Sequence, residues 1–173
     1  MAYRDIVVHA SDNARNSANW TLAGAIAGEH KAHLCAHYTY MPYVFPAYVE
    51  AYVPADIIAR QESERMERAE AAKAEFEEFC RLRQLSHEWH FTRDDPIDTL
   101  SVRARYADVV VVGQEDDNTP LEMADLPPEL VLGCGRPMIV VPYAGKFTGA
   151  GQRVLVAWNG SREATRAVHD ALP

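Results

Sequence analysis

An α/β protein with an open parallel sheet and helices on both faces is the fold class that this sequence predicts. Short apolar segments alternate with helical segments along most of the 173 residues, and this order makes neighbouring strands parallel through crossover helices. Residues 107–113 contain four consecutive valines, a run typical of a central parallel strand that is covered on both faces. These two observations carry the prediction.

The first strand is predicted at residues 5–10, an apolar run that ends at the polar Ser11. A helix follows from residue 14 to about 29, because Ala18, Leu22, Ala25 and Ile26 fall on one face. The second strand is predicted at residues 32–38.

Residues 40–54 form a stretch that is rich in proline and tyrosine. Tyrosine combines apolar area with a polar tip, a combination favoured at interfaces. Two interpretations stay open: this stretch is a lid or a dimer contact, or it is a loop packed on its own sheet.

The longest helix is predicted at about residues 55–85, with Glu and Arg on its outer faces. Its inward stripe recurs at spacings of three and four, at Met66, Ala69, Ala72, Phe76, Phe79 and Leu82 or Arg83. A third strand is predicted at residues 88–92. The next helix starts at Asp95-Pro96, where Asp is a capping residue and Pro suits the first helical position, and it ends near Tyr106.

After the valine strand, a polar loop leads to a short helix at about residues 128–132 and a strand at 137–142. A Gly-rich linker follows, and residues 153–172 then repeat the strand, polar turn and Ala-rich helix of residues 5–24. A lone βα unit cannot bury its own apolar faces. We therefore expect the repeat to dock, by strand pairing or helix packing, on this domain or on a neighbour.

Three regions result: a domain at residues 1–142, a linker at 143–152 and the first βα unit of a truncated second repeat at 153–173. The chain is thus expected to be the front part of a two-domain protein or a shortened relative of one.

Composition excludes several classes of function. The formal net charge of −8 and the lack of a Lys/Arg cluster argue against nucleic-acid binding. No apolar run reaches the roughly 20 residues of a membrane span, and no secretion signal precedes the first strand, so we expect a cytoplasmic protein. The odd number and wide separation of Cys35, Cys80 and Cys134 match neither a disulfide framework nor a zinc motif, which indicates reduced, mostly buried thiols.

Four segments resemble the universal stress protein family in their order and spacing: DIVVHASD, ADVVVVGQ, GRPMIVVP and the second opening VLVAWNGS. The restart at VLVAWNGS is similar to the tandem members, which carry two domains in one chain. The resemblance implies a five-stranded, Rossmann-like sheet of the adenine nucleotide alpha hydrolase type. It also implies a homodimer, often formed through the last strand, and in some members ATP at the carboxyl ends of the strands.

The pocket that this resemblance implies would be lined by Ser11, Asp12, His37, Gly113 and Gln114. ATP-binding relatives end the fourth strand in Gly-x-x-Gly, followed nine residues later by Gly-Ser or Gly-Thr. Here Gly113 matches the first glycine, whereas Asp116 replaces the second and Ala124-Asp125 stands near the Gly-Ser position.

The charge pattern disfavours ATP or AMP in this pocket. No basic residue lies between Arg105 and Arg136. The part of this interval that follows the valine strand contains six acidic residues: Glu115, Asp116, Asp117, Glu122, Asp125 and Glu129. A triphosphate would meet like charges, at about 1 kcal/mol for each close pair in water. We therefore expect a degenerate nucleotide pocket and no required cofactor.

His9, His37 and His90 fall on the first three predicted strands, where neighbouring imidazoles could share a metal. Their spacing has no zinc signature, so we expect three separately hydrogen-bonded histidines and no metal site. No Gly-x-Ser-x-Gly elbow, Walker loop or paired carboxylates are present, so we expect no enzyme.

Three hypotheses follow for function. The first is a non-enzymatic, dimeric stress-response module with protein partners that the sequence does not identify. The second is an ATP-binding or weakly hydrolysing switch, and the third is a carrier of small hydrophobic ligands with a Tyr-rich lid.

Overall fold

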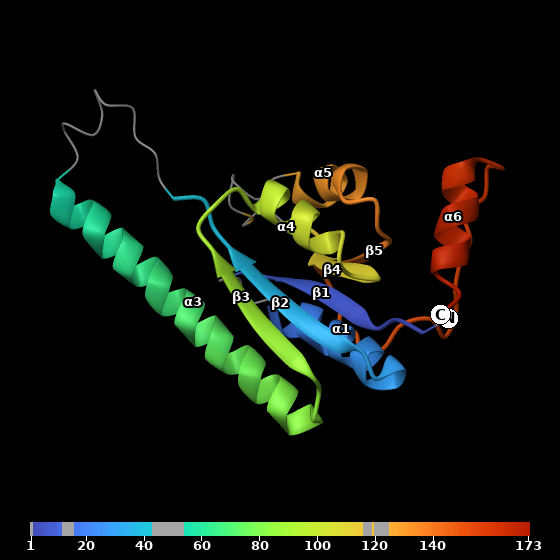
Figure 1. The fold of residues 1–173 in the computed structure, drawn as a ribbon, viewed down its shortest axis with the longest axis horizontal. Coiled ribbons are helices and arrows are strands. Elements are labelled where there is room, and N and C mark those ends of the chain that lie inside the picture. The colour runs from blue at the N-terminus through green and yellow to red at the C-terminus, as the bar shows by residue number, and fades with distance from the viewer. Residues whose placement is uncertain (1, 12–15, 43–53, 116–118, 120–124) are drawn as a thin grey trace.

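The computed structural model describes residues 2–11, 16–42, 54–115, 119 and 125–173 (Figure 1). Its centre is a five-stranded, wholly parallel sheet in the order β3-β2-β1-β4-β5. The strands are β1 (Asp5–Ala10), β2 (His33–Thr39), β3 (His87–Thr92), β4 (Val109–Gly113) and β5 (Met138–Val141). The predicted open parallel sheet is confirmed.

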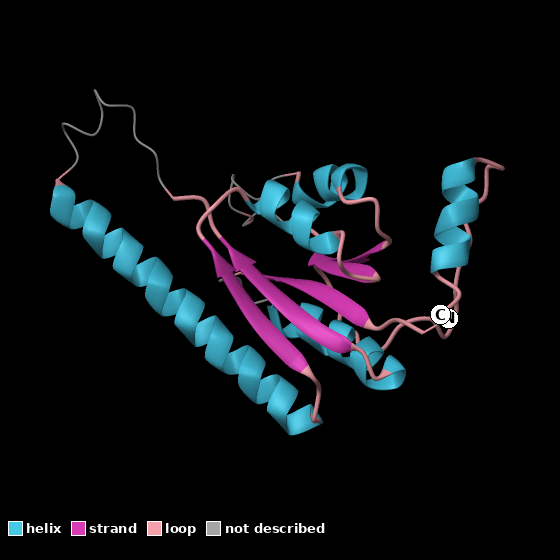
Figure 2. Cartoon of the chain, viewed as in Figure 1, coloured by secondary structure: helices cyan, strands magenta, loops and turns pink. Residues whose placement is uncertain are grey.

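Helices cover both faces of this sheet (Figure 2). The helices that cover the sheet are α1 (Asn16–His30), α3 (Ala55–Arg83), α4 (Pro96–Ala104) and α5 (Leu126–Gly133). A further helix, α6 (Arg162–Asp170), stands apart from the sheet (Figure 1). Helices α1 and α3 pack on one face, and α4 and α5 contact each other on the opposite face. Each predicted helix is present, with ends that differ by a few residues from those expected.

Two apolar cores result, because alternate residues of each strand point to opposite faces. The core beneath α1 and α3 includes Ile6, Val8 and Leu34, whereas the core beneath α4 and α5 includes Val7, Val110 and Val112. The valines of β4 supply both cores, which is why its sequence is apolar without interruption.

Helix α3 buries a narrower stripe than the sequence suggested. Ala69, Ala72, Phe76 and Cys80 are buried, at spacings of three and four residues. Leu82 is 64% exposed, so its expected inward position is wrong. The stripe passes through Cys80 instead, and the helix ends one turn later at Gln84, which has a left-handed backbone.

The other two cysteines, Cys35 and Cys134, are also buried, and all three are free thiols, as expected. In the part of the chain that the structure describes, no helix combines the length and apolarity that a bilayer crossing requires.

The C-terminal segment forms only half of the predicted βα unit. Helix α6 is present, but the expected strand at residues 153–161 does not form. Val154 and Leu155 are 66% and 97% exposed, and a strand without a hydrogen-bonded neighbour is not stable in water. Strand pairing of this segment within the chain was therefore the wrong expectation, and α6 itself buries no residue.

Candidate functional site

The carboxyl ends of β1 and β4 meet where the strand order reverses. Chain order runs outward through β2 and β3 on one side of β1 and through β4 and β5 on the other. In open α/β sheets, ligands bind in the crevice at such a reversal. Ser11 directly follows β1, and Gly113 ends β4, so the fold brings these two predicted site residues to the same edge.

Ser11 is held by the first residue of α1. The Ser11 backbone N–H donates to Asn16 Oδ1 at 3.0 Å, and Asn16 Nδ2 donates in return to the Ser11 carbonyl. Asn16 is only 6% exposed, so this reciprocal pair fixes the chain where β1 leaves the sheet. Asp12, the next predicted site residue, lies outside the described residues.

Gln114 is engaged with the end of β5. Its backbone N–H donates to the Val141 carbonyl at 2.8 Å, and its Oε1 accepts from the Tyr143 N–H at 3.2 Å. Both groups thus stabilise the turn after β5. A ligand role for Gln114 stays a prediction.

The start of α5 lies where the resemblance places the phosphate-binding amides. Free N–H groups in the first turn of a helix bind anions, but Pro127 and Pro128 occupy this turn and have no N–H. The Glu129 N–H is already donated to the Asp125 carbonyl at 3.0 Å. Of the first four residues of α5, only Leu126 keeps a backbone N–H outside the helix bonds.

Asp125 precedes this turn with φ at 67°, a left-handed conformation that glycine adopts most readily. A carboxylate therefore occupies the backbone geometry expected for a phosphate-loop glycine. Asp116, Asp117, Glu122 and Ala124 lie outside the described residues. Sequence reasoning missed the two prolines. Their position at the start of a predicted helix could have indicated that two backbone N–H donors are absent there.

The three strand histidines form one row across the sheet. His9 pairs in register with His37, and His37 with His90. Burial lowers the pKa of His9 to about 4, and burial, aided by the Arg103 cation and by the other two imidazoles, lowers the pKa of His37 to about 4. Both side chains are therefore neutral at physiological pH.

Their hydrogen bonding departs in part from the expectation of three separately satisfied imidazoles. His37 Nε2 lies 3.4 Å from Thr92 Oγ1, and His90 contacts Glu88 and Arg103. Among the described residues, however, His9 Nε2, His37 Nδ1 and His90 Nε2 are buried without a hydrogen bond of good geometry. Such buried polar atoms are rare in folded proteins and often mark a site where a ligand or water binds.

Next to this row, Cys35 and Glu88 are paired in register on β2 and β3. The pKa of the Cys35 thiol is raised to about 12, first by burial and then by the charge and hydrogen bond of Glu88. The pKa of Glu88 is lowered, chiefly by its hydrogen bond with His90. Sequence reasoning considered the histidines alone and missed this pair, although Cys-x-His and Glu-x-His spacing on strands places both residues on one face.

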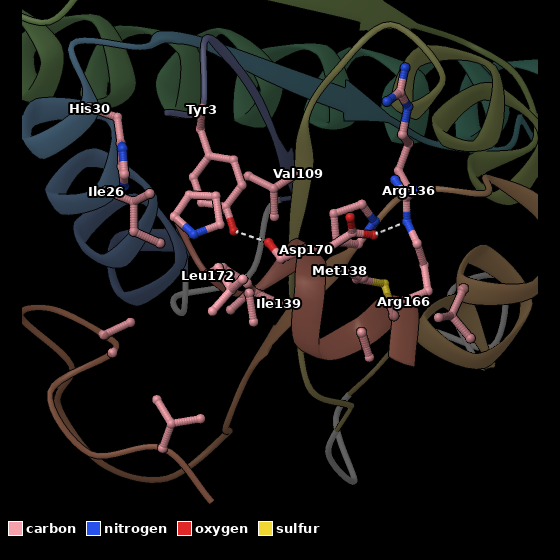
Figure 3. A pocket seen from close by; sticks show the side chains of 18 of the residues that line it. Tyr3, Ile26, His30, Val109, Arg136, Met138, Ile139, Arg166, Asp170 and Leu172 are labelled. Carbon is pink, nitrogen blue, oxygen red and sulfur yellow. Dashed lines mark hydrogen bonds and ion pairs between the residues drawn. The ribbon is translucent and has the colours of Figure 1, made fainter. Parts of the chain in front are cut away.

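A cavity of about 1260 Å³ lies at the other end of the strands, between α6 and the amino ends of β4 and β5 (Figure 3). Ile26, Met138 and Ile139 line it. One side is closed by the Tyr3 hydroxyl, which donates to the Asp170 carbonyl at 2.7 Å. Its walls come from both ends of the chain, so the sequence alone did not indicate it. The Tyr-rich stretch suggested as a ligand lid lies largely outside the described residues.

Comparison of the sequence with protein-family models and with curated proteins finds no match. Solved structures, in contrast, are similar in fold. Universal stress protein UspA from Lactobacillus plantarum is 18% identical, with a TM-score of 0.68, and 82% of the present chain covers 99% of it.

Two nucleotide complexes are also similar. The universal stress protein from Archaeoglobus fulgidus in complex with dAMP is 16% identical, with a TM-score of 0.56 and coverage of 82% of this chain and 99% of that one. A universal stress protein family member from Arabidopsis thaliana with AMP bound is 12% identical, with a TM-score of 0.53 and coverage of 80% and 91%. The sheet order, the helical layers and these structural likenesses establish that the chain has the universal stress protein fold.

Proposed function

We propose that this chain is a non-enzymatic stress-response module of the universal stress protein family. Its nucleotide pocket is proposed to bind the phosphate groups of a nucleotide weakly. The observation that carries the proposal is the start of α5, where Pro127 and Pro128 remove two backbone donors. Asp125 and Glu129 add negative charge at the same place. A phosphate at this position would have few amides to bind and carboxylates to repel it.

Structures with the same fold contain AMP and dAMP, which supports adenine nucleosides as the ligand class to test. In this chain we expect the base and ribose to supply the binding energy. Affinity is then expected to fall from adenosine to AMP to ATP, because each added phosphate brings charge that the pocket does not neutralise.

A thermal-shift titration with adenosine, AMP and ATP, each with and without magnesium, tests this order. ATP with magnesium is expected to raise the melting temperature no more than adenosine does. A ligand at a hundredfold excess over its Kd stabilises by about 2.7 kcal/mol, so a large ATP shift would instead support the ATP switch. A shift produced only by apolar compounds would support the carrier hypothesis.

The double variant Pro127→Ala/Pro128→Ala returns two N–H groups to the start of α5 and is expected to strengthen AMP and ATP binding. Pro96→Ala is the matched control. It restores an N–H at the start of α4, where the Asp95 side chain already accepts from the Ile97 and Asp98 amides, so its nucleotide affinity should not change. Unchanged binding in the double variant would show that the prolines do not limit phosphate binding.

We further propose a homodimer formed through β5. This strand pairs with β4 along one edge, and Val140 and the nearby Tyr143 are 40% and 51% exposed. Sedimentation of Val140→Glu tests the proposal and should give monomers. Val131→Glu on α5, where the native residue is 49% exposed, is the control and should remain dimeric.

A further inference from the structure

We propose that Cys35, Glu88 and His90 form a binding site for a zinc-type transition-metal ion on the sheet face beneath α4. Its three ligands differ from the residues assigned to the nucleotide pocket, although His90 adjoins His37 of that set, and the proposal does not depend on the function proposed above. It differs from the metal arrangement considered for the sequence, which used the three histidines and was rejected.

The register of two neighbouring strands assembles the three ligands. Cys35 on β2 stands directly opposite Glu88 on β3, and His90 follows Glu88 by two residues. Residues two apart on a strand point to the same face, so all three side chains project toward the side that α4 covers. One ligand atom from each lies within 4.8 Å of the others.

These distances suit a small tetrahedral ion. Zinc binds sulfur at about 2.3 Å and nitrogen or oxygen at about 2.0–2.2 Å, which places neighbouring ligand atoms about 3.3–3.7 Å apart. His90 Nε2 and Glu88 Oε1 are already 3.0 Å apart. Side-chain rotations would therefore admit an ion without any change of strand register.

The chemistry of the ligand set favours zinc over magnesium or calcium. A soft thiolate, a borderline imidazole and a hard carboxylate form a mixed set that zinc accepts, whereas magnesium and calcium prefer oxygen ligands alone. Ionised Cys35 and Glu88 would together neutralise a divalent cation.

The site has a closed side and an open side. Cys35 is 8% exposed, whereas the side chains of His90 and Glu88 are 29% and 48% exposed. An ion can therefore enter from the edge of the sheet at β3, and a water molecule can complete the coordination there. Such an open position is typical of zinc sites with three protein ligands.

Two neighbouring side chains modify the site. His33 Nε2 lies 3.9 Å from Glu88 Oε1 on the side away from His90, where it can orient the carboxylate. Arg103 Nη2 lies 3.4 Å from His90 Nδ1, and its positive charge opposes a cation. Since Arg103 is exposed, it can turn to solvent, and Arg103→Gln is expected to strengthen metal binding.

Titration of the metal-free chain with Zn²⁺, monitored by calorimetry, should give one bound ion per chain. Cys35→Ser, Glu88→Gln and His90→Gln should each weaken binding about tenfold or more, a typical cost when a site loses a ligand or its support. Cys80→Ser is the matched control, because Cys80 is an equally buried free thiol in the core on the opposite face. Its affinity should equal that of the unaltered protein.

Co²⁺ provides a second readout that folding defects do not mimic. Thiolate-to-cobalt charge transfer should add near-ultraviolet absorption, which Cys35→Ser should abolish and Cys80→Ser should retain. Glu88→Gln changes a half-exposed side chain, so it tests the site even if Cys35→Ser folds poorly. The proposal is overturned if Zn²⁺ does not bind, or if Glu88→Gln and His90→Gln bind it as tightly as the unaltered protein.

Discussion

The side-chain amide of Asn19 lies against the backbone of Gly113. A β-carbon added to Gly113 would stand 3.0 Å from Asn19 Nδ2 and 3.4 Å from Asn19 Oδ1. Asn19 belongs to α1 and is 7% exposed, whereas Gly113 ends β4. The glycine that resembles a phosphate-binding residue therefore also lets Asn19 of α1 approach the end of β4 closely.

Gly113→Ala should lower the free energy of unfolding by about 1 kcal/mol, because the new methyl group overpacks a buried contact. Urea denaturation measures the change. In the double variant with Asn19→Ala, the methyl group has room, so the two substitutions should be less than additive. Additive effects would show that Asn19 is not the residue that excludes a side chain at position 113.

Two glycines of α1 should respond oppositely to alanine. A β-carbon at Gly24 would stand 2.7 Å from Phe79 Cζ, whereas at Gly28 its nearest neighbour is Leu85 Cδ2 at 3.8 Å. Gly24→Ala should destabilise by about 1 kcal/mol through overpacking. Gly28→Ala should stabilise by about 0.5–1 kcal/mol, because alanine is the better helix former. Thermal or urea unfolding measures both, and a shared sign would contradict the packing of α1 against Phe79.

The free energy of unfolding should decrease as the pH is lowered below neutrality, because His9 is buried as a neutral side chain. Its pKa is about 4 in the folded protein and about 6.5 in an unfolded chain. Between these values the unfolded state binds a proton that the folded state excludes, so the free energy of unfolding decreases as pH falls from about 6.5 to 4. The loss is roughly 3 kcal/mol for this residue.

Urea unfolding at a series of pH values between 7.5 and 4.5 measures this dependence, and His9→Gln should reduce its slope. His169→Gln is the control, because the His169 side chain is 58% exposed. This substitution should leave the slope unaltered. Equal slopes in all three proteins would mean that His9 is protonated without cost in the folded state.

Asp108 joins the start of β1 to the start of β4. Its Oδ2 accepts from the Arg4 and Asp5 backbone N–H groups, at 2.6 and 3.1 Å. Asp108→Ala should destabilise by about 1–2 kcal/mol, because both donors lose their protein acceptor. Asp108→Asn keeps a neutral side-chain oxygen and should cost less. Urea denaturation measures the free energy of unfolding of both variants. If Asp108→Asn loses as much as Asp108→Ala, the side-chain oxygen does not stabilise the two strand starts.

The C-terminal segment should be removable from the folded domain. Residues Gly145, Lys146, Gly149 and Gly151 are exposed, and α6 buries no residue, so limited proteolysis should cut within residues 145–151. We expect the remaining domain to keep its melting temperature to within a few degrees. A large drop, with the cut site confirmed by mass spectrometry, would show that α6 is an integral part of the fold.

The α/β class, the order of the elements and the two-sided cover of β4 were predictable from the sequence. These follow from local periodicity, capping and turn residues, which act over a few neighbours along the chain. Weak phosphate binding stays a prediction of the sequence, which rests on acidic residues that can be counted without coordinates. Leu82 and the strand expected at residues 153–161 were misjudged, since burial and strand pairing depend on what lies opposite.

Contacts between side chains that lie far apart in the sequence were not predictable and follow from the folded arrangement. Strand register brought Cys35, Glu88 and His90 to one face, and the docking of α1 placed Asn19 on Gly113. A sequence records spacing along one strand, but the pairing of residues more than 50 positions apart depends on how strands align and helices pack. For that reason the fold was predictable, whereas the candidate metal site and the cavity beneath α6 were not.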